Sequence, residues 1–376
     1  RAPLTMLMLP FFKLMADKKA SDLFFSCGTP PQIKIDGQTL QVNDKPLTPD
    51  NVKRLAYSLM SEDEIATFEA EMEMNFGRQV DGLGNYRVNI FSQRGQVAMV
   101  IRYITPNIPS LASLNLPDSL QDLIRQRRGL IFIVGSTGSG KSSTVAAMLE
   151  HRNQTQPGHI LTVEDPIEFI FEHKRAIINQ REIGVDTHSY QNALKNAMRE
   201  APDVLMIGEI RDAETLTYAI NYAQSGHLCI STLHGNNSYH TLNRIISFFP
   251  LENRNALLMD LAATLKAVVS QRLVQTVDGK RRPAMEIMFN TAHVSELIRN
   301  GEIDKIKEAI ESSMSEGSQT FEQSLFRLYK DGLISLDEAL QNADSPTNLF
   351  WLINHDSASG QDKQDTTTFT GFTLNH

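Results

Sequence analysis

Cysteine is scarce in this sequence, with only Cys27 and Cys229 among 376 residues. We expect the two to lie in different domains, so nothing indicates a disulfide framework, and a reducing compartment fits. Long hydrophobic runs are also missing. The apolar stretch at residues 4–12 is too short to span a bilayer, is interrupted by Pro10, and leads into charged residues 13–19 rather than a cleavage site. We expect a cytoplasmic protein in which this stretch forms a short helix packed on its own domain.

An excess of basic residues is missing as well. The chain has 36 Lys and Arg against 44 Asp and Glu, a formal net charge of −8. Proteins that bind nucleic acid through a broad basic surface have the opposite balance, so the composition argues against that class and leaves room only for a local patch. A hydrophobic fraction of 41% is typical of a globular protein, and the length suggests two or three domains. No internal repeat or heptad run is evident.

The first hundred or so residues predict a mixed α+β module. One hairpin is expected around Asp36-Gly37, and a second has its turn at residues 93–95. Between them, Thr48 is expected to cap a helix that opens with Pro49. The proline-containing residues 105–110 predict an extended linker.

From about residue 116 to residue 289, strand-like runs alternate with helix-like ones, which predicts a parallel α/β core. The expected strands are Leu130–Val134, Ile160–Val163, Val204–Ile207 and Leu228–Ser231. After Asn290 the apolar residues return to helical spacing. The polar residues 355–376 predict a disordered tail.

The stretch IVGSTGSGKSST, residues 133–144, has the spacing of a phosphate-binding loop, with an apolar run before it and a helix-forming run after it. Glycines let backbone N–H groups turn toward an anion, Lys141 reaches the outer phosphates, and the Ser142 hydroxyl can ligate Mg²⁺. We therefore predict a nucleotide site. The residues expected to contact the nucleotide are Gly135, Ser136, Thr137, Gly138, Ser139, Gly140, Lys141, Ser142 and Ser143.

A nucleoside triphosphatase also needs carboxylates near the metal and the attacking water. The apolar strand at residues 160–163 delivers Glu164, Asp165 and Glu168 at its C-terminal end, where ligands bind in open parallel sheets. Residues 203–212 resemble a Walker B strand that ends at Glu209. Glycine precedes Glu209 where many proteins of this kind have aspartate, so Glu209 is expected to manage the metal's water shell or the nucleophile without an acidic neighbour immediately before it.

Two histidines, His227 and His234, flank the last predicted strand. No third and fourth ligand follows at finger-like spacing, which disfavours zinc. One interpretation is that both imidazoles sense the terminal phosphate of the nucleotide. The alternative, hydrogen-bonded histidines of the core, stays open.

The motifs GSTGSGKS, TVEDPIEF, GEIRD and SGHLCISTLH, in that order, resemble the Walker A, Asp, Walker B and His boxes of the secretion ATPase superfamily. More narrowly, the chain resembles the PilT/PilU group of type IV pilus retraction ATPases. It is most similar to the PilU branch in the stretches LHGNN, RIISFFP and QTFEQSLF. The similarity runs from Ser21 to about Leu352.

This resemblance implies an α/β protein with a RecA-like P-loop ATPase core, an α+β PAS-like N-terminal domain and a helical C-terminal part. The expected boundaries are 1–108 for the PAS-like domain with its linker, 109–290 for the ATPase domain, 291–354 for the helical region and 355–376 for the tail. Residues 291–301 only partly follow the Ala-Ile-Arg helix pattern of the PilT branch. That departure fits an accessory motor that acts with a PilT-like ATPase.

The resemblance also implies ATP and Mg²⁺ as cofactors, with Ser142 and Glu209 at the metal. Glu168 would help to activate water, and His234 would face the terminal phosphate. Arg87 and Arg102 match arginines that reach the γ-phosphate when the two domains close, although exposed strand arginines are otherwise typical of a solvated face. An arginine fork would neutralise charge that builds on the transferring phosphoryl group.

The implied assembly is a homohexameric ring at the cytoplasmic face of the inner membrane, at the pilus base. Its partners would be a PilT-like retraction ATPase and an inner-membrane platform protein, with no nucleic acid and no membrane span. Three other interpretations remain: a GTPase, disfavoured because no Asn-Lys-x-Asp motif is found; a RecA-like DNA translocase; and an ATP-binding ring scaffold with little turnover.

Overall fold

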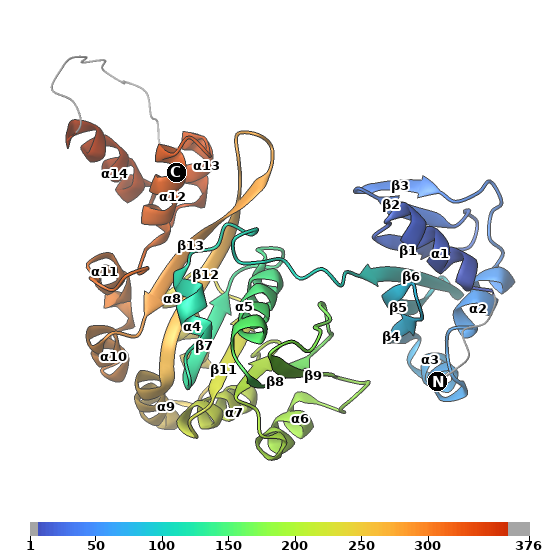
Figure 1. The fold of residues 1–376 in the computed structure, drawn as a ribbon, viewed down its shortest axis with the longest axis horizontal. Helices are drawn as coiled ribbons and strands as arrows, with labels where there is room; N and C mark the ends of the chain where they lie inside the picture. The colour runs from blue at the N-terminus through green and yellow to red at the C-terminus, as the bar shows by residue number, and fades with distance from the viewer. Residues whose placement is uncertain (1–6, 360–376) are drawn as a thin grey trace.

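A computed structural model describes residues 7–359, which form two β-sheets, each with its own helices (Figure 1). The chain leaves the smaller sheet through an extended segment, residues 105–110, and then builds the larger one. Residues 7–104 are called the N-terminal unit below. Its Cys27 and the buried Cys229 of the larger sheet are both free thiols.

The sheet of the N-terminal unit is antiparallel throughout, with the strand order β3-β2-β1-β6-β5-β4. Its elements are α1 (Leu9–Lys18), β1 (Asp22–Phe25), β2 (Gln32–Ile35), β3 (Gln38–Gln41), α2 (Pro49–Tyr57), α3 (Glu62–Glu71), β4 (Glu73–Val80), β5 (Gly84–Gln93) and β6 (Gln96–Ile104). Helix α1 carries Pro10 in its first turn and buries Phe12 against Tyr86 of the sheet. The expected packing of this short apolar helix on its own unit is therefore confirmed for residues 7–18; residues 4–6 lie outside the described part.

Both predicted hairpins are present. Asp36 and Gly37 have φ of 48° and 80°, and Arg94 and Gly95 have φ of 50° and 72°. Positive φ at both central residues is what a two-residue turn needs to match the twist of the strands it joins. The predicted cap of α2 is also confirmed, because the Thr48 hydroxyl accepts a hydrogen bond from the Asn51 amide at 3.2 Å.

The larger sheet has the order β13-β12-β7-β11-β10-β8-β9, with every pair parallel except β12 and β13. Its strands are β7 (Gly129–Val134), β8 (Gly158–Glu164), β9 (Ala176–Glu182), β10 (Val204–Ile207), β11 (Leu228–Leu233), β12 (Leu265–Gln275) and β13 (Arg281–Phe289). The strands β7, β8, β10 and β11 confirm the predicted runs and form the middle of the sheet. The outer strands β9, β12 and β13 are not among the strands predicted from the sequence.

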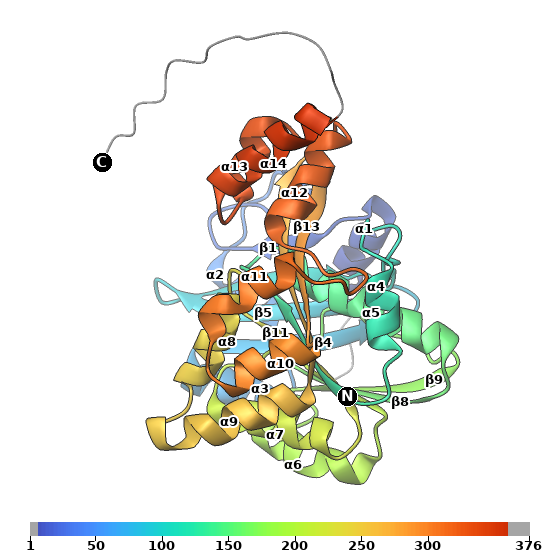
Figure 2. The same cartoon turned by 90° about the vertical axis from the view of Figure 1, so that its left-hand side faces the viewer.

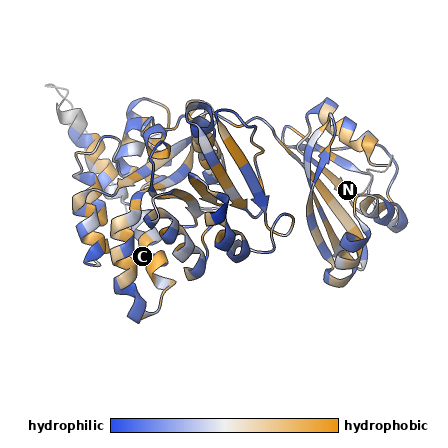
Figure 3. Ribbon diagram, turned by 60° about the horizontal axis from the view of Figure 1, so that its bottom comes forward, coloured by the Kyte–Doolittle hydropathy of each residue, from blue (hydrophilic) through white to orange (hydrophobic). Residues whose placement is uncertain are grey.

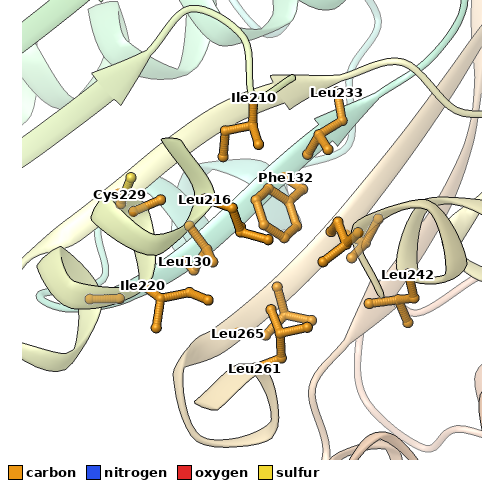
Figure 4. Close-up of a cluster of buried hydrophobic side chains, with 14 of the residues drawn as sticks. Leu130, Phe132, Ile210, Leu216, Ile220, Cys229, Leu233, Leu242, Leu261 and Leu265 are labelled. Carbon is orange, nitrogen blue, oxygen red and sulfur yellow. The ribbon is translucent and has the colours of Figure 1, made fainter. Parts of the chain in front are cut away.

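Helices cover both faces of this sheet because its middle strands are apolar on both sides. Along β7, Leu130 and Phe132 pack with Leu216 of α7 and Leu261 of α9 (Figure 4), whereas Ile131 packs on the α4 and α5 side. Figure 3 shows the same pattern, with hydrophobic strands between helices that are hydrophobic on one side. These helices are α4 (Ser119–Ile124), α5 (Lys141–Thr155), α6 (Tyr190–Ala197), α7 (Ala213–Gln224), α8 (Ser238–Ser247) and α9 (Leu251–Thr264).

After β13, the described part of the chain continues in helices. They are α10 (Ala292–Arg299), α11 (Ile306–Glu311), α12 (Phe321–Lys330), α13 (Leu336–Asn342) and α14 (Pro346–Ser359). Figure 2 shows α12, α13 and α14 gathered at the far end of the β12–β13 hairpin, where Phe321 and Leu325 pack against Val274 and Ala284.

Helix α14 continues to Ser359, which lies within the segment that the sequence predicts as a disordered tail. The rest of that predicted tail, residues 360–376, lies outside the described part. Across residues 7–359, no helix combines the length and the apolar character that crossing a bilayer requires.

Candidate nucleotide site

The phosphate loop joins the C-terminal end of β7 to the first turn of α5, and its glycines are required for different reasons. Gly138 and Gly140 have φ of 78° and 90°, a conformation that side chains disfavour. At Gly135 a Cβ would lie 2.2 Å from the Ser139 hydroxyl oxygen and 2.8 Å from the carbonyl oxygen of Gln271. The loop is thus a tight cradle whose backbone lies directly against β12.

Lys141 and Ser142 open helix α5 beside this cradle. The Lys141 ammonium donates to the carbonyl oxygens of Gly135 and Ser136 at 2.7 and 2.8 Å. Burial lowers the pKa of Lys141, while the nearby carboxylates of Glu209 and Glu168 act in the opposite direction. A cation, a helix N-terminus and two acids therefore face one another, which is a suitable place for a metal-bound polyphosphate.

A cavity of about 290 Å³ lies between the phosphate loop and the C-terminal ends of β8, β10 and β11. Parallel strands bring their C-terminal ends to one edge of the sheet, which is why motifs far apart in the sequence meet here. The predicted residues that line this cavity are Thr137, Gly138, Lys141, Ser142, Glu164, Glu168, Glu209 and His234.

Glu209, at the end of β10, is held by two neighbours. Its Oε2 accepts a hydrogen bond from Arg211 Nε at 2.7 Å, and its Oε1 lies 3.0 Å from His234 Nε2. The Thr232 hydroxyl donates to the carbonyl oxygen of Gly208 at 2.6 Å and fixes β10 against β11. The predicted Walker B and His boxes therefore form one hydrogen-bonded group beside the cradle.

Tyr190, which the sequence analysis missed, accounts for the glycine before Glu209. A Cβ at Gly208 would lie 2.9 Å from the Tyr190 hydroxyl oxygen and 3.2 Å from the Glu164 Cα. The hydroxyl of Tyr190, the first residue of α6, thus occupies the space that the side chain of a Walker B aspartate at position 208 would need. Burial raises the pKa of Tyr190, so the group is a neutral hydroxyl in the cavity wall. No motif in the sequence signals this role.

Glu164 lines the cavity as predicted, but its carboxyl is tied into the wall. Its Oε2 accepts from the Thr162 hydroxyl at 2.7 Å and from the Gln180 amide at 3.2 Å. Burial raises the pKa of Glu164 to about 7, because a charged carboxylate is costly in this environment. Glu168, two residues beyond Pro166, faces the cavity from an irregular segment, residues 165–175, called the Asp-box loop below. Asp165 of the same segment also lines the cavity.

The two predicted arginines lie side by side on β5 and β6 of the N-terminal unit. Arg87 Nη2 donates to the carbonyl oxygen of Ile167 in the Asp-box loop at 2.9 Å. Arg102 instead forms an ion pair with Asp22, with 2.8 Å between Nε and Oδ1. Neither side chain lines the 290 Å³ cavity. Their predicted contact with a γ-phosphate stays a prediction, and the structure adds that Arg87 joins the two units of one chain.

His227 is not brought to the cavity. It immediately precedes β11, whereas His234 immediately follows it, and a strand of this length spans about 20 Å. Its Nδ1 is buried with no hydrogen-bond partner in the described part of the chain, and its ring contacts Tyr222 with 5.8 Å between centroids. The prediction that His227 contacts nucleotide stays a prediction: the residue does not line the 290 Å³ cavity, and its half-buried ring lies beside Tyr222.

The serines of the loop do not all line the same cavity. Ser136 and Ser139 line a second cavity of about 670 Å³ on the β12–β13 side of the loop, together with Arg272, Lys280 and Arg281. The two cavities share Thr137 and Gly138. Ser143, on α5, lines neither of them.

The donor set fits a magnesium-bound nucleoside triphosphate. The loop can pack this closely against Ser139 and Gln271 only because positions 135 and 140 carry no Cβ. Ser142 and Glu209, a hydroxyl and a carboxylate, line the same cavity, and Mg²⁺ prefers oxygen ligands of this kind with water completing the shell.

The fold and this site define the class of P-loop nucleoside triphosphatases with a largely parallel sheet. Residues 14–307 match the family model described as "Type II/IV secretion system protein", and the chain belongs to this family. It is 44% identical to the Type IV pilus ATPase PilU of Pseudomonas aeruginosa over 93% of this chain and 92% of that protein. The Type IV pilus retraction ATPase PilT of the same organism is 38% identical over 89% and 97%.

A solved structure of the pilus retraction motor PilT with bound ADP superimposes with a TM-score of 0.85, at 39% identity over 93% of this chain and 99% of that one. The resemblance to the PilT/PilU group is thereby confirmed. So is the expected fold, with a RecA-like core, an α+β N-terminal part and a helical C-terminal part.

Proposed function

We propose that this chain is an ATP-hydrolysing motor of the type IV pilus machine that drives or assists pilus retraction, as an accessory ATPase dependent on a PilT-like partner. Its similarity to PilU and PilT over about nine tenths of the chain supports this assignment. The observation that carries it is the convergence of Lys141, Glu168 and Glu209 on one cavity beside the phosphate loop.

In this proposal the loop amides and Lys141 hold the β- and γ-phosphates, and Ser142 and Glu209 hold Mg²⁺ and its water shell. The metal would neutralise charge on the phosphates. Glu168 orients or deprotonates the attacking water, and His234, held against Glu209, faces the terminal phosphate. Glu164, which is buried, and Tyr190, which is half-buried, form part of the cavity wall and limit the access of bulk water there.

The proposal includes a homohexameric ring at the cytoplasmic face of the inner membrane, in contact with the platform protein at the pilus base. ATP would draw the N-terminal unit of each subunit toward its core, with Arg87 and Arg102 reaching the terminal phosphate, and hydrolysis would release it. Sequential closure around the ring would then turn a central surface.

Pilus retraction in living cells tests this proposal. Piliated bacteria that lack the gene are complemented with the wild-type chain or with Glu168→Gln, and fluorescent pili are followed in cells that contain the PilT-like partner. We expect the wild-type chain to increase the frequency or force of retraction and Glu168→Gln to fail. Equal retraction with both versions would reject a motor that hydrolyses ATP and favour a ring scaffold.

A further inference from the structure

The Asp-box loop has no regular secondary structure, yet it carries the proposed catalytic carboxylate Glu168. A catalytic group needs to be held within a fraction of an ångström by its surroundings. In this loop, side chains of other elements hold the backbone by hydrogen bonds on either side of Glu168.

Two of these side chains lie on β9. Gln180 and Glu182 are two residues apart, so they project to the same face of the strand. Glu182 Oε1 accepts from the Ile167 amide at 3.1 Å. Gln180 donates to the carbonyl oxygen of Phe169 at 2.8 Å and accepts from the Phe171 amide at 3.0 Å. The bonds therefore fall on the residues immediately before and after Glu168, and on the third residue after it.

The third side chain is Arg87, from the N-terminal unit. Its Nη2 donates to the carbonyl oxygen of Ile167 at 2.9 Å, so the backbone of Ile167 is held at its N–H by Glu182 and at its C=O by Arg87. Arg87 and Glu182 also line the same cavity of about 270 Å³, together with Asp165 and Pro166. Their opposite charges favour this arrangement.

We propose that Glu182 is a positioning residue for ATP hydrolysis: with Arg87 it clamps the Ile167 backbone and thereby sets the position of Glu168. The inference rests on the proposed role of Glu168. Because half of the clamp comes from the N-terminal unit, movement of that unit changes the hold on Glu168 directly. The two units are thus linked by a backbone contact in addition to any contact through nucleotide.

Steady-state ATP hydrolysis by the full chain tests the clamp. Two substitutions of Glu182 separate the effect of side-chain length from the effect of its charge. Glu182→Gln keeps the length and an acceptor oxygen, whereas Glu182→Asp keeps the charge but is one methylene shorter. We expect Glu182→Gln to stay within about threefold of the wild-type kcat and Glu182→Asp to lose about tenfold, since small misplacements of reacting groups are costly. The KM for ATP is expected to stay within about twofold in both, because the phosphate cradle is untouched.

Glu172→Ala is the matched control, because Glu172 is an exposed glutamate in the same loop; its kcat and KM are expected to equal the wild-type values. A wild-type kcat in Glu182→Asp, a loss confined to KM, or a loss in Glu182→Gln as large as in Glu182→Asp would overturn the clamp. Glu168→Gln is measured alongside. If it keeps full activity, the proposed function of Glu168 fails; if it is inactive while both Glu182 variants are normal, only the clamp fails.

Discussion

Three side chains surround the Walker B residues Gly208 and Glu209 in the cavity. The hydroxyl of Tyr190 stands beside Gly208, and Arg211 and His234 both bind Glu209. Lys141, Glu168 and Glu209 could be predicted from the sequence because each belongs to a short contiguous motif. Tyr190 and Glu182 could not, because they reach the site through packing across the sheet rather than through spacing along the chain.

Gly208→Ala is expected to destabilise the protein by about 1–3 kcal/mol, the usual cost of forcing a methyl group into a packed site. The new Cβ would lie 2.9 Å from the Tyr190 hydroxyl oxygen and 3.3 Å from the carbonyl oxygen of Val163. Thermal unfolding measures the loss. Adding Tyr190→Phe removes the nearest clash and is expected to restore part of the stability. An unchanged melting temperature in Gly208→Ala would show that the neighbouring groups can move aside at no cost in stability.

Glu164→Gln is expected to change how stability depends on pH. Burial raises the pKa of Glu164 to about 7 from its ordinary 4.5, so between these values the folded state binds more protons than the unfolded state. Wild-type stability therefore falls as pH rises through this range, and above it the buried charge is a constant cost. The glutamine has no proton to lose and can still accept from Thr162 and Gln180.

Denaturant unfolding at pH 5 and pH 8 measures this difference. Relative to the wild type, the Glu164→Gln chain is expected to be more stable at pH 8 than at pH 5. If the difference in stability between Glu164→Gln and the wild type is the same at both pH values, Glu164 ionises as it does in water.

Among the helices and strands, those with the clearest periodicity were predictable. The apolar runs of β7, β8, β10 and β11 are buried on both faces, which made them visible in the sequence. Strand β9 was not predicted because it lies at the edge of the sheet, where polar residues such as Asn179, Gln180 and Arg181 replace a continuous apolar run. The sequence places the boundary of the helical region at residue 354 because the last turn of α14 is polar, a composition that resembles a disordered tail.

The cap of α7 tests how firmly the Walker B region is anchored. The Asp212 carboxylate accepts from the Thr215 amide at 2.8 Å, only three residues after Glu209. Asp212→Ala is expected to cost about 1 kcal/mol of stability, whereas Asp212→Asn keeps an acceptor oxygen and is expected to cost a few tenths. Denaturant unfolding of both variants checks this. Equal losses would mean that charge at the helix N-terminus, rather than the cap bond, provides the stabilisation.

At the scale of the whole molecule, the N-terminal unit contacts the Asp-box loop of the larger unit. Arg87 makes that contact, whereas Arg102 is paired with Asp22 on its own sheet. The sequence indicated which arginines to consider only through a family resemblance. Their separate partners could not be predicted, because they depend on how two independently folded sheets meet.

The proposed activity is ATP hydrolysis at the cavity beside the phosphate loop, in a ring of identical subunits. Its most direct test is ATP turnover recorded together with the mass of the assembly, with and without Mg²⁺, for the purified wild-type chain and Lys141→Ala. We expect Mg²⁺-dependent turnover by an assembly of about six times the 42.2 kDa chain. Lys141→Ala should lose about 100-fold in turnover or more. A monomer with no turnover under any condition, or equal turnover by both chains, would rule out this activity.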